Sequence, residues 1–240
     1  MASADYAYVG SELDTFKEAR NWKRYWSSVL EPYVHGRVLE VGAGVGANVP
    51  YLLNPRVTTF VALEPDARLA ERLAASSQDL GTGRAAEIEP RHGVLSDLPP
   101  DDRFDTIIYL DVLEHIEADR DEVAAAAARL RPGGHLLVLA PAFQQLYSEF
   151  DRAIGHYRRY TAATLQALTP AGLAVVHVRY LDALGACLSA ANRLVLSKSM
   201  PSLANILFWD RCIVPVSRVA DVALGRLVGR SVVCVWQKND

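Results

Sequence analysis

Cysteine is scarce in this sequence, with three residues among 240 at Cys187, Cys212 and Cys234. They are odd in number and widely separated, which excludes a disulfide framework and a cysteine-ligated zinc site. The spacing instead predicts reduced thiols, as in cytosolic proteins. We therefore expect no metal site in this chain.

Long hydrophobic runs and an excess of positive charge are also missing. No stretch of about 18 apolar residues is free of charged residues, so the sequence predicts no transmembrane helix. The first ten residues lack a basic region followed by an apolar run, so no signal peptide is expected and the sequence indicates a cytoplasmic protein. The net charge of -3 gives no overall attraction to phosphate backbones, so nucleic acid is not expected as a partner.

The chain does contain the material for one large α/β domain, with half of its residues hydrophobic. Short apolar runs with strand character alternate with helical segments from residue 36 onward. The expected strands are Arg37 to Val41, Thr58 to Leu63, Ile88 to Leu95, Phe104 to Leu110 and Gly134 to Ala140. The expected helices between them include Pro65 to Ser76 and Asp119 to Leu130. Buried strands separated by helices predict a doubly wound, mostly parallel sheet covered on both faces.

Two helical regions flank this pattern. Residues 1–35 show near-helical apolar spacing and predict an N-terminal lid on a core of residues 36–181. Residues 182–230 form a helical insertion before a last strand in residues 231–240, and they are too numerous for a loop. The apolar stripe of the insertion favours core packing or a homodimer contact. A membrane-surface contact through 206–209 beside Arg211 is the alternative.

A glycine-rich turn follows the first expected strand at Gly42, Gly44 and Gly46. Such a turn lets a ligand approach bare backbone at the carboxyl edge of the sheet. With Ala47 and Glu64 it also fits the G-x-G-x-x-A pattern of nicotinamide-dependent oxidoreductases. Glu40 distinguishes a nicotinamide cofactor from a cationic one. Its carboxylate is unfavourable beside a pyrophosphate and favourable beside a cationic cofactor.

Two further motifs occur downstream, at residues 104–116 and at Leu130-Arg131-Pro132-Gly133-Gly134. With the glycine turn, they make residues 35–141 closely resemble class I S-adenosylmethionine-dependent methyltransferases. The resemblance implies a Rossmann-like, seven-stranded sheet with a final antiparallel strand. It implies S-adenosylmethionine as cofactor and S-adenosylhomocysteine as product. The methyl acceptor would be an oxygen or nitrogen atom of a small molecule, a glycan or a lipid-like compound. The alternatives are an NAD(P)-dependent oxidoreductase and a non-catalytic binding protein of the same fold.

The resemblance also implies cofactor-binding roles at matching positions. These positions are Tyr25, Glu40, Gly42, Ala43, Gly44, Gly46, Glu64, Pro65, Val94, Leu95, Asp111, Val112 and Leu113. Glu64 would accept hydrogen bonds from both ribose hydroxyls, and Tyr25 would cover the cofactor together with Trp22. Many relatives carry an acid after the third strand to bind the adenine, but no acid directly follows Gly93 here. The backbone of Val94 and Leu95 would serve instead, with Asp97 as a helper.

The segment from Tyr147 to Thr161 concentrates aromatic, acidic and basic side chains after the fifth strand. Its His156 is a candidate general base, and His115 is a second candidate beside the cofactor edge. The side chains of Tyr157, Arg158 and Arg159 would contact the substrate, with the arginines holding a carboxylate or phosphate. The alternative is a polar loop ordered by its own ion pairs.

Overall fold

The sheet of this protein has seven strands in the order β3-β2-β1-β4-β5-β7-β6. A computed structural model describes residues 13–81, 86–195, 202–225 and 227–240. Parts of the predicted lid (1–12) and insertion (196–201 and 226) lie outside the described residues. The strands are β1 (Gly36–Val41), β2 (Val57–Glu64), β3 (Glu87–His92), β4 (Phe104–Leu110), β5 (Leu130–Pro141), β6 (Leu173–Leu181) and β7 (Ser231–Lys238).

The strand directions confirm the predicted mostly parallel sheet. β1 pairs in parallel with β2 and β4, and β4 pairs in parallel with β5. β7 runs antiparallel to both of its neighbours, β5 and β6, with Cys234 opposite Val138 and Val178. The predicted last strand is therefore present, and it is antiparallel. β3 ends at His92, earlier than the predicted Leu95, because Gly93 turns the chain with φ +141°.

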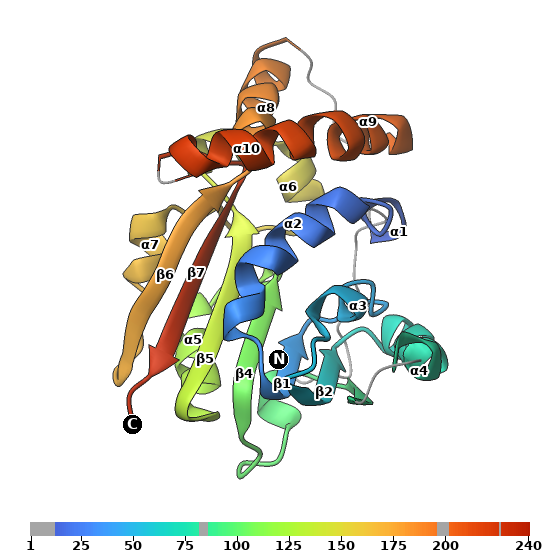
Figure 1. Ribbon diagram of the computed structural model, residues 1–240, viewed down its shortest axis with the longest axis vertical. Coiled ribbons are helices and arrows are strands. Elements are labelled where there is room, and N and C mark those ends of the chain that lie inside the picture. Colours follow the sequence, from blue (N-terminus) through green and yellow to red (C-terminus); the bar gives the residue numbers. More distant parts are fainter. Residues whose placement is uncertain (1–12, 82–85, 196–201, 226) are drawn as a thin grey trace.

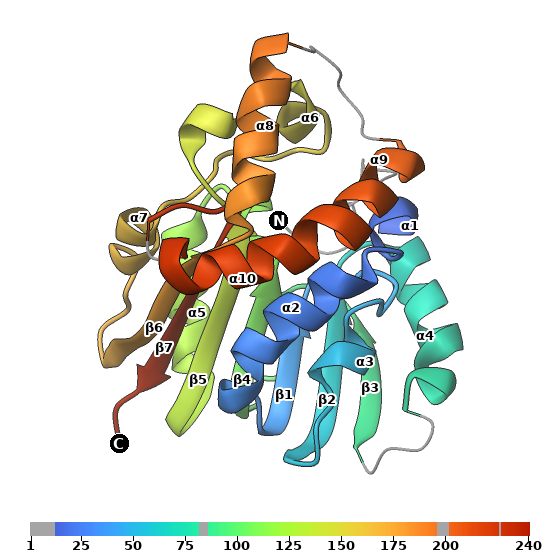
Figure 2. The ribbon, with the colours of Figure 1, turned by 45° about the horizontal axis from the view of Figure 1, so that its top comes forward.

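Helices cover both faces of the sheet (Figures 1 and 2). The α-helices are α1 (Leu13–Phe16), α2 (Arg20–Leu30), α3 (Val49–Leu52), α4 (Ala67–Gly81), α5 (Asp119–Ala128), α6 (Glu149–Ala153), α7 (Ala162–Gln166), α8 (Ala183–Val195), α9 (Leu203–Phe208) and α10 (Val214–Leu224). The short helices are η2 (Glu31–Tyr33), η3 (Leu95–Asp97), η4 (Leu113–His115) and η5 (Gln144–Leu146), with a π-helical turn η6 (Trp209–Ile213) joining α9 to α10. The helix after the glycine turn, α3, is short and ends at Leu52, because the Asn54-Pro55 sequence disfavours a further helical turn.

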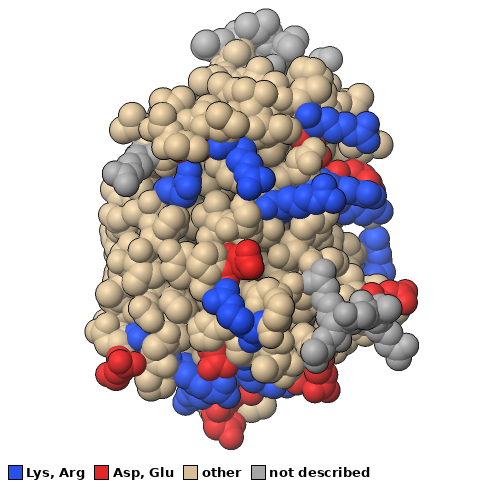
Figure 3. All heavy atoms as spheres, in the orientation of Figure 1, with Lys and Arg blue, Asp and Glu red and all other residues tan. Residues whose placement is uncertain are grey.

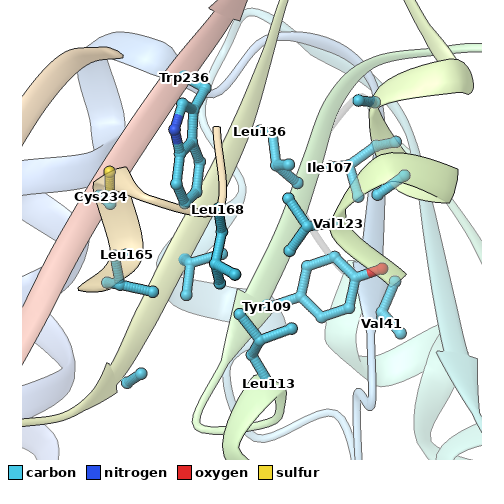
Figure 4. Close-up of a cluster of buried hydrophobic side chains, with 14 of the residues drawn as sticks. Val41, Ile107, Tyr109, Leu113, Val123, Leu136, Leu165, Leu168, Cys234 and Trp236 are labelled. Carbon is cyan, nitrogen blue, oxygen red and sulfur yellow. The ribbon is translucent and has the colours of Figure 1, made fainter. Parts of the chain in front are cut away.

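Each face of the sheet has its own hydrophobic core. One core places Val123 of α5 and Leu165 of α7 against the strands, and it contains the buried Trp236 and Cys234 of β7 (Figure 4). The other packs α2, α3, α4 and the α9–α10 region against the opposite face. All three cysteines are free thiols, as predicted. Burial raises the pKa of Cys234 to about 12, so this thiol stays protonated.

The insertion packs against the lid through buried carboxylates. Asp210 accepts hydrogen bonds from the backbone N–H groups of Asn21 (3.2 Å) and Trp22 (2.8 Å) at the start of α2. Asp182 is fully buried and accepts from Trp209 Nε1 at 2.7 Å and from Ser217 at 2.6 Å. The Asp210 bonds hold α2 against η6, and the Asp182 bonds hold η6 and α10 against the start of α8, above the carboxyl edge of the sheet (Figure 1). None of the helices in the described part of the chain combines the length and apolar character needed to cross a bilayer.

Candidate functional site

A cavity of about 270 Å³ lies at the carboxyl edge of the central strands, beneath α2 and the insertion. Loops after β1, β2 and β4 form one side of it, and the lid and the C-terminal region form the other. Its polar and glycine lining includes Lys23, Gly42, Gly44, Asn48, Glu64, Asp111, Glu114, His115, Asp151, His156, Arg159 and Arg230. This is the edge at which ligands bind in open α/β sheets.

The glycine turn after β1 brings bare backbone to the cavity. Gly42 has φ +70°, and a Cβ at this position would lie 2.6 Å from a methyl carbon of Val112. No other residue type fits there without moving the loop after β4. The N–H groups of Gly42 and Ala43 are held by the Leu63 carbonyl at 2.8 and 3.0 Å, which fixes the turn against β2.

Glu64 ends β2 and points its carboxylate at this turn. One oxygen accepts from Gly44 N–H at 2.7 Å and the other from Asp66 N–H at 2.9 Å. These bonds orient the carboxylate and leave further lone pairs on both oxygens, because an ionised carboxylate has about four acceptor sites. Burial raises the pKa of Glu64, and the two backbone hydrogen bonds oppose this rise. The side chain is thus a fixed bidentate acceptor on the cavity wall.

Three polar side chains connect the lid to β1. Lys23 of α2 donates to Asn48 Oδ1 at 2.5 Å, and Asn48 Nδ2 donates to Glu40 Oε1 at 3.0 Å. The second oxygen of Glu40 is buried and has no hydrogen-bond partner among the described residues. Burial raises the pKa of Glu40 to about 7 and lowers the pKa of Lys23. A buried acceptor without a partner is costly. Glu40 does not line the cavity itself, whereas its neighbours Lys23 and Asn48 do.

A second polar group forms around the short helix η4 after β4. Asp111 has φ +54°, Glu114 is fully buried, and His115 and His156 meet edge to face with ring centroids 4.5 Å apart. Burial, with a smaller effect of His156, lowers the pKa of His115 to about 4, so this ring is neutral at pH 7. Burial and the neighbouring Asp111 raise the pKa of Glu114 well above its usual range.

Asp151 holds His156 in place from the α6 segment. Its Oδ1 lies 2.9 Å from His156 Nδ1, and Arg159 donates to both carboxylate oxygens at 2.8 and 2.9 Å. Burial would raise the pKa of Asp151, but the hydrogen bonds from His156 and Arg159 outweigh it and hold the pKa well below its usual range. The His156 backbone is also fixed, because Tyr147 donates to its carbonyl at 2.6 Å. His156 Nε2 is left facing Glu114 at 3.7 Å.

Sequence reasoning missed several residues of the cavity, and Arg230 is the most informative. Its guanidinium stacks 4.7 Å from the Trp209 ring centroid, and no carboxylate of the described residues lies within ion-pair distance of it. Arg230 directly precedes β7. Because β7 is antiparallel, its first residue lies at the same edge as the carboxyl ends of β4 and β5. The position of Arg230 directly before the last strand is the sequence feature that could have placed it at the cavity.

Besides Glu40 and Val94, four residues predicted to bind the cofactor do not line the cavity. Tyr25 donates its hydroxyl to Asp221 of α10 at 2.8 Å, so it fastens the lid to the insertion. The missing Cβ of Gly46 accommodates Leu73 and Leu80 of α4. The side chains of Leu113 and Leu95 are buried in the hydrophobic core. Tertiary packing thus places these four residues outside the cavity.

The predicted adenine contact at Val94 and the predicted substrate anchors Tyr157 and Arg158 also lie outside the cavity. The Val94 N–H donates to Asp97 Oδ2 at 2.9 Å, so Asp97 closes this turn. Arg158 pairs with Asp119 at 2.7 Å and donates to the Glu117 carbonyl, which makes it part of the loop framework. Tyr157 is 49% exposed outside the cavity. The alternative of a loop ordered by its own ion pairs therefore describes Arg158, whereas Arg159, His156 and His115 do line the cavity.

Residues 16–178 match a protein-family model described as a methyltransferase domain. Among curated proteins, the tRNA U34 carboxymethyltransferase of Shewanella pealeana is 28% identical over 136 residues, which cover 55% of this chain and 40% of that protein. The corresponding protein of Shewanella amazonensis is 29% identical over 132 residues, covering 54% and 38%. The chain thus spans about two fifths of the length of these relatives.

Solved structures share the fold at low sequence identity. The YcgJ protein of Bacillus subtilis superposes with a TM-score of 0.56 at 15% identity, covering 92% of this chain and 99% of that one. The N-methyltransferase NodS of Bradyrhizobium japonicum gives a TM-score of 0.53 at 15% identity, covering 95% and 99%. Both comparisons agree with the predicted Rossmann-like architecture.

Proposed function

This chain is a class I S-adenosylmethionine-dependent methyltransferase of the methyltransferase-domain family, and we propose that its acceptor is a small molecule with an anionic group beside the methylated oxygen or nitrogen. The family excludes the nicotinamide-dependent and non-catalytic interpretations. One observation carries the proposal. The cavity that holds the glycine turn also contains Arg230, a partly buried cation with no carboxylate within ion-pair distance among the described residues.

The residues of the cavity fit the methyl donor. The buried, unpartnered oxygen of Glu40 would accept a hydrogen bond from the α-ammonium group of the donor. Lys23, which is connected to Glu40 through Asn48, would hold the α-carboxylate. Glu64 would accept from the ribose hydroxyls, with Pro65 beside it. Asp111 and Val112 would lie near the sulfonium. When bound, S-adenosylmethionine supplies an electrophilic methyl group on a positively charged sulfur.

The remaining residues act on the acceptor. Arg230 holds the anionic group of the acceptor by charge-assisted hydrogen bonds. His156 presents Nε2 to the cavity and takes the acceptor's proton, while Asp151 orients the ring through Nδ1. His115 lies beside it as a neutral neighbour. Trp22 and the insertion close the cavity above, which aligns the reactants and excludes water.

We predict that the binding of S-adenosylhomocysteine depends on pH through Glu40. The pKa of this carboxyl is about 7 in the free protein, and the ammonium group requires its ionised form. Below pH 7 the Glu40 carboxyl is protonated and must lose its proton before the ligand binds. The affinity is therefore highest above pH 7 and falls as the pH is lowered. Calorimetry should give about tenfold weaker binding at pH 6 than at pH 8. The variant Glu40→Gln should show no such dependence, and an equally steep dependence in this variant would exclude Glu40 as the titrating group.

The acceptor class is tested by transfer of a radiolabelled methyl group to hydroxyl and amine compounds offered in pairs, with and without a carboxylate or phosphate. Label should enter the anionic member of each pair. Arg230→Met should raise KM for it by roughly 10- to 100-fold, the value of one charge-assisted hydrogen-bonded contact of about 1.5–3 kcal/mol. The variant Arg230→Lys keeps the positive charge, so its KM for the anionic acceptor should rise less than that of Arg230→Met. Unchanged KM in Arg230→Met would overturn the assignment.

A tRNA acceptor is the second candidate, and two observations favour it. The curated relatives are named as tRNA U34 carboxymethyltransferases, and Lys and Arg side chains gather over α2 and α10 on one face of the molecule (Figure 3). The expectation of no nucleic-acid partner came from net charge alone, and this local clustering removes its support. Label entering total tRNA, with none in the small-molecule pairs, would establish this candidate instead.

A further inference from the structure

Glu114, His115 and His156 come together on the wall of the cavity, although His156 is distant from the other two in sequence. One ligand-type atom from each residue lies within 4.8 Å of those of the other two. Ligands of a single metal ion lie about 3–4 Å apart when each bond is near 2.1 Å. The three side chains therefore need only a small contraction to reach the same ion.

Glu114 provides an independent reason to expect a cation here. Its side chain is fully buried, and neither carboxylate oxygen has a hydrogen-bond partner in another described residue. His156 Nε2 lies 3.7 Å from Glu114 Oε1, which is beyond hydrogen-bond distance. Native proteins rarely bury such a group without a partner, because its desolvation is not compensated. A cation between the carboxylate and the imidazoles would compensate it.

The orientation of His156 also suits a metal ligand. Imidazoles that bind metal ions usually donate their other ring N–H to a carboxylate or carbonyl, which fixes the ring and the free nitrogen. His156 makes this contact through Nδ1 with Asp151 at 2.9 Å, and Arg159 holds Asp151 in turn. Nε2 is the nitrogen that remains directed toward Glu114. The supporting contacts of a metal-binding imidazole are therefore in place around His156.

We propose that Glu114, His115 and His156 bind one divalent transition-metal ion, such as Zn²⁺ or Mn²⁺, with open coordination positions toward the acceptor. Two imidazoles and one carboxylate suit these ions, whereas Mg²⁺ and Ca²⁺ prefer ligand sets made of oxygen. No metal was expected from the sequence, in which cysteine spacing was the only metal signal considered. The fold supplies a different set of ligands.

The consequence for catalysis rests on the proposed function. A bound cation would lower the pKa of an acceptor hydroxyl that coordinates it, so that the hydroxyl loses its proton to water before the cavity closes around both reactants. An oxygen lone pair then forms the bond to the methyl carbon, and sulfur keeps the electron pair of the bond that breaks. His156 is a ligand in this state, and it takes the proton directly when no cation is bound.

The test is calorimetric titration of the chelator-treated protein with Zn²⁺, Mn²⁺ and Mg²⁺ separately. One Zn²⁺ or Mn²⁺ should bind per chain, and Mg²⁺ should not compete at equal concentration. Glu114→Gln and His156→Asn should each weaken binding at least about 100-fold. His177→Gln, which replaces a histidine outside the cavity, should leave binding unchanged. Absence of stoichiometric binding, or equal binding by the Glu114→Gln and His156→Asn variants, would overturn the proposal.

Binding of S-adenosylhomocysteine and methyl transfer are measured on the same samples, which separates this inference from the proposed function. Each variant must still bind S-adenosylhomocysteine, because this shows that the fold and the cofactor half of the cavity are intact. Metal binding without methyl transfer would count against the acceptor assignment alone. Full transfer by a protein that binds no metal would count against the metal site alone.

Discussion

Replacing Glu64 by alanine is expected to weaken S-adenosylhomocysteine binding by roughly 100- to 10,000-fold. The carboxylate is held by Gly44 and Asp66 N–H groups in the orientation that accepts from two ribose hydroxyls. Each charge-assisted hydrogen bond contributes roughly 1.5–3 kcal/mol, so loss of both removes about 3–6 kcal/mol of binding free energy. Calorimetric titration of wild-type and variant protein at pH 8, where Glu40 is ionised, measures the difference.

The matched control is Glu71→Ala, which removes an exposed carboxylate from α4 outside the cavity. Its affinity should equal that of the wild type. Glu64→Gln should fall between the two, because an amide keeps one acceptor oxygen and loses the charge. Wild-type affinity in a folded Glu64→Ala protein would show that another residue binds the ribose.

Replacing His156 by alanine is expected to reduce turnover by roughly 100- to 10,000-fold, which is the usual range for loss of a general base. The ring contributes Nε2 to the acceptor side of the cavity and does not contact the glycine turn through any hydrogen bond of the described residues. Affinity for S-adenosylhomocysteine should therefore stay within about twofold of the wild type. Single-turnover transfer of a labelled methyl group measures the chemical step directly.

The control for this variant is His177→Gln, on β6 away from the cavity. It should transfer the methyl group at the wild-type rate. Asp151→Asn should slow transfer by a smaller factor than His156→Ala, because the ring remains present but loses its charged partner. Unchanged turnover in His156→Ala would return this histidine to a purely structural role.

The sheet was predictable because its signals are local. Runs such as Phe104 to Leu110 are apolar and bounded by turn residues, and the connections in parallel sheets have one hand. Gly42 and Glu64 were predictable for the same reason, since the end of a strand and its following turn fix their positions. The antiparallel direction of β7 was implied by the family resemblance and not by the strand's composition.

The cavity's other half depends on packing between distant segments. Lys23 was not singled out, since its importance follows from the contact of α2 with Asn48. Tyr25 lies on the same helix, but its hydroxyl finds Asp221 almost two hundred residues away. Asp151 and Arg230 become meaningful only once the fold places them around His156. Long-range partners of this kind leave no periodic trace in a single sequence.

The position of β7 between β5 and β6 also has a consequence for biosynthesis. β6 forms the edge of the sheet, and its neighbour is β7, which is synthesised after it. When β6 has been synthesised, its partner strand β7 still lies beyond the whole insertion, residues 182–230. The nascent chain therefore exposes two unpaired strand edges, on β5 and on β6, until residue 238 emerges. Chaperone dependence of folding should consequently be concentrated in this late stage of translation.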